Sequence, residues 1–174
     1  KETINFTMCI YKFITRHRPF SYSQIRKCMS TQPVLARKKP SHNPVMTQEV
    51  LNYMKPMDKQ LIVDMTFGAG GHSQTLLNAG KNLKIIALDR DPVSHERALE
   101  LSEVYPNRII PLLGKFSELP DLLESINIHQ CSIDGFLFDF GCSSMQFDTA
   151  SRGFSVSKDG PLDMRMDGDR IPDR

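Results

Sequence analysis

Four short apolar runs recur along the later part of the chain, separated by polar and glycine-containing segments. They have the length of buried strands and cover residues 61–65, 83–88, 108–113 and 133–139. Pro111 lacks a backbone N–H, so the third run is expected to be an edge strand or a strand end. The segments between the runs carry apolar residues at helical spacing. Strands that alternate with helices predict an α/β fold, with a parallel sheet and helices on both faces.

Three helices are expected between these strands. The first is closed by Gly80. The second begins at Asp91, whose carboxylate can cap it, with Pro92 in the first helical position. The third is expected to begin after Ser117, another candidate cap. Their apolar positions are Leu76, Leu77 and Ala79 in the first, Ala98, Leu99 and Leu101 in the second, and Leu119, Leu122, Leu123 and Ile126 in the third.

The first predicted strand runs into a glycine-rich turn, Gly68-Ala-Gly-Gly71, and Asp89 follows at the tip of the next strand. Glycines let a backbone approach a ligand closely, and a carboxylate at the second strand tip can accept both hydroxyls of a ribose. The turn alone could be a close-packed strand–helix connection, but the acid at this distance favours a cofactor that contains a nucleoside. The third glycine of a dinucleotide fingerprint is displaced, and no phosphate-binding loop is present. Asp64, just before the turn, suits an ammonium group and would repel a pyrophosphate, which favours S-adenosylmethionine over NAD.

The composition indicates one globular domain. The chain has 174 residues, of which 40% are hydrophobic, and no run approaches the roughly 18 apolar residues of a membrane span. Its four cysteines contain no CxxC pair. This argues against a zinc site and a disulfide scaffold, predicts no bound metal, and fits a reducing compartment.

The charge is distributed unevenly. Residues 1–41 hold nine Lys or Arg against one acid, Glu2, whereas residues 42–174 carry a net charge of −6. A basic, acid-poor leader with apolar residues over 6–16, able to form an amphipathic helical turn or two, is typical of a mitochondrial transit peptide. A nucleic-acid-binding arm and a plain disordered tail are the alternatives. We therefore predict a leader over residues 1–41 and location in the mitochondrial matrix.

Six motifs in the later part of the chain carry a more specific signal. They are His42–Met46, Asp64–Ser73, Asp89–Pro92, Asp139–Asp148, Arg152–Ser155 and Asp159–Asp167, in that order. Over about residues 42–168 the chain resembles the cytosine-N4 methyltransferases of small-subunit ribosomal RNA, the MraW/RsmH type, and most of all its mitochondrial members. The resemblance implies a class I methyltransferase (Rossmann-like) fold. Residues 42–174 would be the N-terminal part of that domain, and the sheet is expected to be incomplete at the C-terminus.

The resemblance also implies roles for individual residues. Cofactor contacts are expected from Gly70, Gly71, His72, Asp89, Phe116, Asp139 and Gln146. We further hypothesise that Asp139, with Ser143 or Ser144, orients the exocyclic amine of the target cytidine. The alternative is that Asp139 only binds the cofactor and the serines cap a turn. Two roles are equally open for the loop that holds Arg152, Phe154, Arg165 and Asp167. Its charged residues could fasten the loop by ion pairing, or Phe154 and the arginines could receive a flipped base.

The function implied is S-adenosylmethionine-dependent N4-methylation of a cytidine in mitochondrial small-subunit ribosomal RNA, in support of subunit maturation. Phosphate neutralisation dominates RNA affinity, so an acidic domain needs help in binding RNA. We expect docking on an assembling ribosomal particle or a partner protein, without membrane insertion. A truncated, catalytically inactive nucleotide-binding module with a binding or regulatory role is the main alternative. A methyltransferase acting on DNA or protein is the other.

Overall fold

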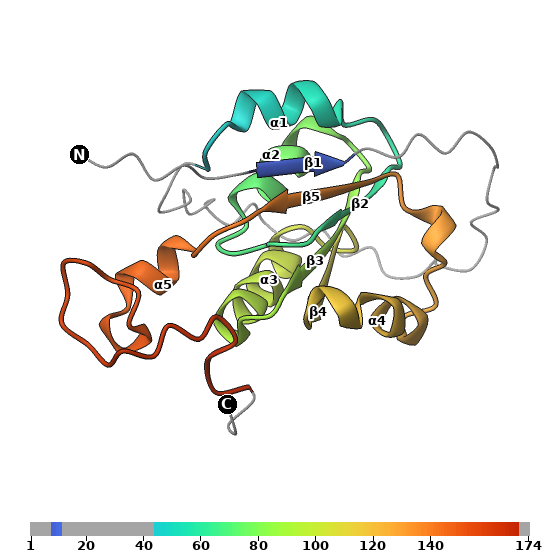
Figure 1. The fold of residues 1–174 in the computed structure, drawn as a ribbon. Helices are drawn as coiled ribbons and strands as arrows, with labels where there is room; N and C mark the ends of the chain where they lie inside the picture. The colour runs from blue at the N-terminus through green and yellow to red at the C-terminus, as the bar shows by residue number, and fades with distance from the viewer. Residues whose placement is uncertain (1–7, 12–43, 171–174) are drawn as a thin grey trace.

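The computed structural model describes residues 8–11 and 44–170, and within them a single five-stranded sheet flanked by helices (Figure 1). The strands are β1 (Met8–Tyr11), β2 (Leu61–Asp64), β3 (Lys84–Asp89), β4 (Ile109–Leu113) and β5 (Gly135–Asp139). The α-helices are α1 (Thr47–Met54), α2 (Gly71–Ala79), α3 (Pro92–Val104), α4 (Leu119–Ser125) and α5 (Ser144–Asp148). Short 3-10 turns are η1 (Phe116–Glu118), η2 (Gln130–Ser132), η3 (Ala150–Arg152) and η4 (Gly168–Arg170).

The strand order is β1-β5-β2-β3-β4, and the last four of these strands are parallel. The four predicted strands are therefore confirmed, and Pro111 lies on β4, at the edge of the sheet, as expected. Successive connections run outward from β2 to β4, after which the chain crosses back so that β5 pairs with the other side of β2. Ligands of such doubly wound sheets bind at this reversal, outside the carboxyl ends of the strands.

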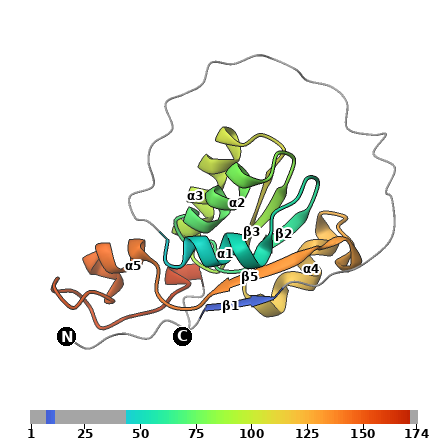
Figure 2. The same cartoon turned by 90° about the horizontal axis from the view of Figure 1, so that it is seen from above.

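Side chains from the sheet fill two cores, one on each face. On one face α1, α2 and α3 pack against β2, β3 and β5, with Leu76, Ile85, Leu101 and Leu137 in the shared cluster. On the other face α4 packs against the opposite side of the same strands through Leu119 and Leu123. Figure 2 shows the sheet between α1 and α4. Helices on both faces, which the alternating pattern predicted, are confirmed.

The residues predicted to end α2 and to begin α3 are confirmed. The α2 helix ends at Gly80, and Asp91 caps α3 by accepting a hydrogen bond from the backbone N–H of Val93 at 3.0 Å, with Pro92 following. Of the three apolar residues singled out in α3, Leu99 does not belong to the core, because it is 48% exposed. Ala98 faces the sheet, and a residue one position later points about 100° away from it around the helix.

The expected cap at Ser117 is wrong. Ser117 lies inside η1, and α4 begins directly after Glu118. Glu118 uses its carboxylate to accept the backbone N–H of Lys115 at 2.7 Å, which closes the 3-10 turn. That turn continues into α4 without the extended residue that a serine cap requires.

The strand β1 was not predicted. Helical turns were expected over residues 6–16, whereas Met8–Tyr11 is a strand that pairs antiparallel with β5, from Met8 opposite Asp139 to Tyr11 opposite Phe136. A free strand edge presents a row of unpaired N–H and C=O groups that an extended segment can bind. The rest of the predicted leader lies outside the described residues. Among residues 8–11 and 44–170 no helix has the length and apolar character needed to cross a membrane.

Candidate functional site

Asp89 and the glycine-rich turn contact each other at the carboxyl ends of β2 and β3. The backbone N–H of Gly68 donates to Oδ2 of Asp89 at 2.7 Å, and that of Asp91 donates to Oδ1 at 3.0 Å. Burial raises the pKa of Asp89 above its ordinary value, and these two N–H groups partly offset the rise. A carboxylate has about four lone-pair positions, so Asp89 can still accept further donors such as hydroxyls. Gly68 and Asp89, which are 21 residues apart in the sequence, are therefore in direct contact.

The turn before α2 requires glycine at one position and is tight at the next. Gly70 has φ of 80°, and a Cβ placed there would lie 2.6 Å from Cζ of Phe67. At Gly71 a Cβ would lie 3.1 Å from the ring of Pro44. Gly70 and Gly71 therefore allow close packing of the turn against Phe67 and Pro44. The helix α2 begins at Gly71 without a side-chain cap, so its first N–H groups have no acceptor within the helix.

Asp64, at the end of β2, lies inside the protein. Its Oδ2 accepts the hydroxyl of Ser73 at 2.6 Å, and its Oδ1 accepts the backbone N–H of Thr66 at 3.2 Å. The carboxyl is almost completely enclosed, and burial raises its pKa to about 6. Asp64 is therefore satisfied by its neighbours, and the more accessible carboxylate beside the glycine turn is that of Asp139.

Asp139 ends β5 directly beside the end of β2. Its backbone N–H donates to the hydroxyl of Thr66 at 2.7 Å, which fixes the strand end, and its side chain is 31% exposed. Nε2 of His72 lies 3.4 Å from Oδ2 of Asp139. The imidazole is buried, and neither of its nitrogens has a hydrogen-bond partner among the described residues. Buried nitrogens without a hydrogen-bond partner, at the carboxyl ends of the strands, are suited to bind a ligand.

The loop after β5 is held by Gln146. Its amide oxygen accepts the backbone N–H of Ser143 at 3.1 Å, and its own N–H donates to the hydroxyl of Ser143 at 3.3 Å, a capping box for α5. Nε2 of Gln146 donates to Oδ2 of Asp91 at 2.9 Å. Ser143 is thus an N-cap, one of the alternatives that the sequence left open, and Ser144 is the first residue of α5. The predicted contacts of Gln146 with the cofactor, and of the serines with the substrate, stay predictions.

Phe116 lies in an aromatic cluster on the α4 side of the same edge. Its ring centroid is 5.7 Å from that of Phe138 and 6.1 Å from that of Phe140, and the latter two are 5.4 Å apart. Phe116 and Phe140 remain 45% and 40% exposed. An exposed ring at this place is compatible with the predicted contact to a nucleobase.

Sequence analysis left the role of Arg152 open and missed that of Asp91 beyond its cap. The guanidinium of Arg152 binds both carboxylate oxygens of Asp91 at 2.9 and 3.2 Å and the carbonyls of Arg165 and Met166. Nearby, Arg90 pairs with Asp167 at 2.9 Å and lowers the pKa of that carboxyl. Of the two roles considered, these contacts favour ion pairing for Arg152 and Asp167. Asp163 and Arg165 form a further pair on the surface.

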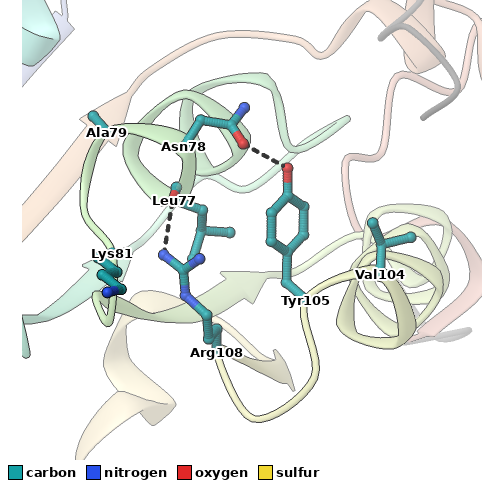
Figure 3. Close-up of a pocket in the computed structure, with 7 residues that line it drawn as sticks. All are labelled: Leu77, Asn78, Ala79, Lys81, Val104, Tyr105 and Arg108. Atoms are coloured by element: carbon teal, nitrogen blue, oxygen red, sulfur yellow. Dashed lines mark hydrogen bonds between the residues drawn. The ribbon is translucent and has the colours of Figure 1, made fainter. Parts of the chain in front are cut away.

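A cavity of about 410 Å³ lies at the opposite end of the sheet (Figure 3). It is lined by the ends of α2 and α3 and by Arg108. The guanidinium of Arg108 donates to the carbonyls of Leu77 at 2.7 Å and Leu83 at 3.0 Å, and also to that of Gly80. These bonds satisfy carbonyls at the C-terminus of α2. We therefore interpret this cavity as part of the structural packing around Arg108. The candidate functional site lies instead at the carboxyl ends of the strands.

Comparisons with known proteins show the family of the chain. The model of the MraW methylase family matches residues 39–171. The chain belongs to this family. The resemblance seen in the motifs is confirmed, and the expected α/β fold, a parallel sheet with helices on both faces, is observed.

Three relatives illustrate the family. The chain is 59% identical over 145 residues to a putative receptor-type tyrosine-protein phosphatase, mosPTP-1, of Culex quinquefasciatus, covering 83% of this chain and 9% of that protein. It is 54% identical over 129 residues to a probable methyltransferase-like protein 15 homolog of Drosophila melanogaster, covering 73% and 36%. It is 51% identical over 132 residues to the 12S rRNA N(4)-cytidine methyltransferase METTL15 of Bos taurus, covering 76% and 32%. The chain thus spans about a third of the two methyltransferases and a tenth of the mosquito protein.

Proposed function

We propose that this chain carries the cofactor half of an S-adenosylmethionine-dependent enzyme that methylates N4 of a cytidine in mitochondrial small-subunit ribosomal RNA. The observation that carries the proposal is the pair of carboxylates at the reversal of the sheet: Asp89, which contacts the glycine turn from the end of β3, and the partly exposed Asp139 at the end of β5. A relative that shares half of the aligned residues is named for this reaction on 12S rRNA.

The residues present fit the cofactor. Asp89 has lone pairs left for ribose hydroxyls, and the first N–H groups of α2, which begins beside it, have no acceptor within the helix. His72 has two unpaired nitrogens at the same edge, and Phe116 offers an exposed ring for the adenine. S-adenosylmethionine would supply the methyl group as an electrophile on a sulfonium centre.

The protein's own contribution is to orient the target amine. The lone pair of a cytosine amine is delocalised into the ring, so N4 must become pyramidal before it can form a bond to carbon. A carboxylate oxygen of Asp139 that accepts a hydrogen bond from N4 would favour this geometry. Alignment of the two reacting atoms contributes further, since positioning alone can supply several kcal/mol of a barrier. Thr66 holds the backbone of Asp139, and the Ser143 turn follows directly.

The acidic character of residues 42–174 bears on the substrate. With a net charge of −6 this region has little of the phosphate neutralisation that binding to free RNA requires. We therefore propose that the RNA is presented in an assembling mitochondrial ribosomal particle, or by a partner protein, in the matrix. The basic residues 1–41 support import into mitochondria as a transit peptide.

Calorimetric titration of S-adenosylmethionine into the 174-residue chain tests the cofactor assignment. Asp89→Asn keeps the size of the side chain but removes its charge. It should weaken binding by at least about tenfold, because each hydrogen bond to a charged group contributes about 1.5–3 kcal/mol. Glu103→Gln, which removes an exposed charge from α3, should bind like the wild type. A folded wild-type chain that does not bind would refute the assignment.

The reaction is tested in cells that lack the gene. Nucleoside mass spectrometry of mitochondrial small-subunit RNA should show loss of N4-methylcytidine, restored by the wild-type gene and not by Asp139→Ala. Restoration by Asp139→Ala would remove Asp139 from the mechanism. Cofactor binding without any change in the RNA would favour the non-catalytic nucleotide-binding alternative, or methylation of DNA or protein.

A further inference from the structure

The carboxylate of Asp91 receives more hydrogen bonds than a helix cap needs. It is 1% exposed, and it accepts the backbone N–H of Val93 at 3.0 Å in the ordinary capping manner. It also accepts Nε2 of Gln146 at 2.9 Å and Nη1 of Arg152 at 2.9 Å. The last two residues come from segments 55 and 61 positions later in the chain. Asp91 therefore joins the start of α3 to the region after β5.

These partners connect Asp91 with the rest of the carboxyl edge. The backbone N–H of Asp91 donates to Asp89, which also accepts the N–H of Gly68. Gln146, through its capping box, holds the backbone N–H of Ser143. A continuous path of hydrogen bonds thus runs from the glycine turn after β2, through the turn after β3, to the loop after β5.

Arg152 extends the same path into the segment 149–170, which we call the strap. Its Nη2 donates to the carbonyl of Arg165 at 3.0 Å and to that of Met166 at 3.1 Å. Arg90, between Asp89 and Asp91, binds Asp167 of the strap in a second ion pair. In Figure 1 the strap extends from α5 away from the sheet and returns to the same edge. Two ion pairs therefore fasten the strap to the turn that carries the proposed ribose ligand.

We propose that Asp91 is a positioning residue for the cofactor site. It does not touch the cofactor but fixes Asp89, the Ser143 turn and the strap relative to one another through Gln146 and Arg152. This inference rests on the proposed function, because Asp89 is taken as the ribose ligand. Since the position of Asp89 depends on the N–H of Asp91, displacement of Asp91 weakens cofactor binding at a distance.

Asp91→Asn isolates this role from capping. Asparagine caps helices as well as aspartate does, so the bond to Val93 and the start of α3 are preserved. Its amide NH₂, however, replaces Oδ2, so the bonds that Oδ2 accepts from Gln146 and Arg152 are lost, and Arg152 keeps only the longer contact to Oδ1, which is no longer charged. Glu100→Gln is the matched control, because it breaks the ion pair with Arg97 at 2.6 Å on the exposed side of the same helix.

Two quantities are measured on the 174-residue chain: hydrogen exchange of the strap amides without ligand, and the calorimetric affinity for S-adenosylmethionine. Asp91→Asn should accelerate strap exchange and weaken cofactor binding, each by about tenfold or more, the change expected for loss of a charge-assisted hydrogen bond. Glu100→Gln should alter neither. Adding Gln146→Glu to Asp91→Asn exchanges donor and acceptor between these two side chains but does not restore the charge that Arg152 pairs with, so it should recover part of the affinity even if the single variant folds poorly.

The outcomes separate the two proposals. Unchanged strap exchange in a folded Asp91→Asn variant overturns the link through Arg152. Faster exchange with unchanged affinity overturns the positioning role and leaves Asp91 a structural residue. Failure of the double variant to recover affinity removes Gln146 from the path. A wild-type chain that is folded but does not bind the cofactor refutes the proposed function, and the inference falls with it.

Discussion

Stability should depend on the protonation of Asp64. Its carboxyl is 2% exposed, and burial raises its pKa from the ordinary 3.8 to about 6 despite the hydrogen bond from Ser73. Between these two pH values the folded state holds a proton that the unfolded state has released. The free energy of unfolding therefore falls as the pH rises from about 4 to about 6. Because a tenfold change in proton affinity is worth about 1.4 kcal/mol, the total loss by pH 7 is about 3 kcal/mol.

Asp64→Asn removes this pH dependence while keeping the shape of the side chain. The amide oxygen can still accept the hydroxyl of Ser73, but the NH₂ group faces the backbone N–H of Thr66 and leaves it unpaired. That mismatch costs about 1–3 kcal/mol, and the cost does not change with pH. The difference in free energy of unfolding, variant minus wild type, should therefore rise by about 3 kcal/mol between pH 4 and pH 7. The cost of the mismatch shifts this difference by the same amount at every pH.

Urea unfolding followed by circular dichroism at pH 4, 5, 6 and 7 measures the difference. Burial also raises the pKa of Asp89, so this residue makes the free energy of unfolding depend on pH as well. That dependence is present in both proteins and cancels when the two curves are subtracted. Glu103→Gln, an exposed acid on α3, should follow the wild-type curve at every pH. If Asp64→Asn and the wild type give parallel curves, the carboxyl of Asp64 ionises normally in the folded protein and the reasoning is refuted.

Three further changes test packing and backbone geometry. Gly70→Ala should destabilise the chain by about 1–3 kcal/mol, because φ is positive and the new Cβ meets the ring of Phe67; Phe67→Leu should relieve only the clash and restore part of the melting temperature. Leu137→Ala, in the fully buried centre of β5, should cost about 2–5 kcal/mol in urea unfolding, whereas Leu162→Ala, at a 95% exposed position, should change stability by less than about 0.5 kcal/mol. Ser73→Ala should cost about 1–3 kcal/mol at pH 7, where the carboxylate that it binds is charged, and less near pH 4.

The parallel sheet could be predicted because its signals are local. Each strand is a short apolar run, and the Asp91-Pro92 pair marks the start of α3 within two residues. The β1 strand could not be predicted in this way. It exists through pairing between residues about 130 positions apart, and its four residues carry no periodicity of their own. Leu99 shows a similar limit, because apolar composition does not say which side of a helix faces the sheet.

The same distinction between local and long-range contacts applies to the candidate site. The contact between Gly68 and Asp89 was implied by a spacing that spans one β-α-β unit, so sequence analysis could anticipate it. The pairing of Asp91 with Arg152 joins different loops, and no spacing rule names the partner of an arginine. The enclosure of Asp64 also depends on packing: Ser73, in the first turn of α2, folds back on the end of β2.

The carboxylates at this edge of the sheet differ mainly in how their charge is balanced. Asp64 is enclosed and bound by Ser73 and the backbone N–H of Thr66, and Asp91 is paired with Arg152. Asp89 is held by backbone N–H groups, which carry only partial charges, and Asp139 has His72 at 3.4 Å. The negative charge that remains available is therefore concentrated on Asp89 and Asp139, on either side of the glycine turn. A ligand with hydroxyl donors at one end and a positive centre at the other complements this distribution better than a pyrophosphate, which both carboxylates would repel.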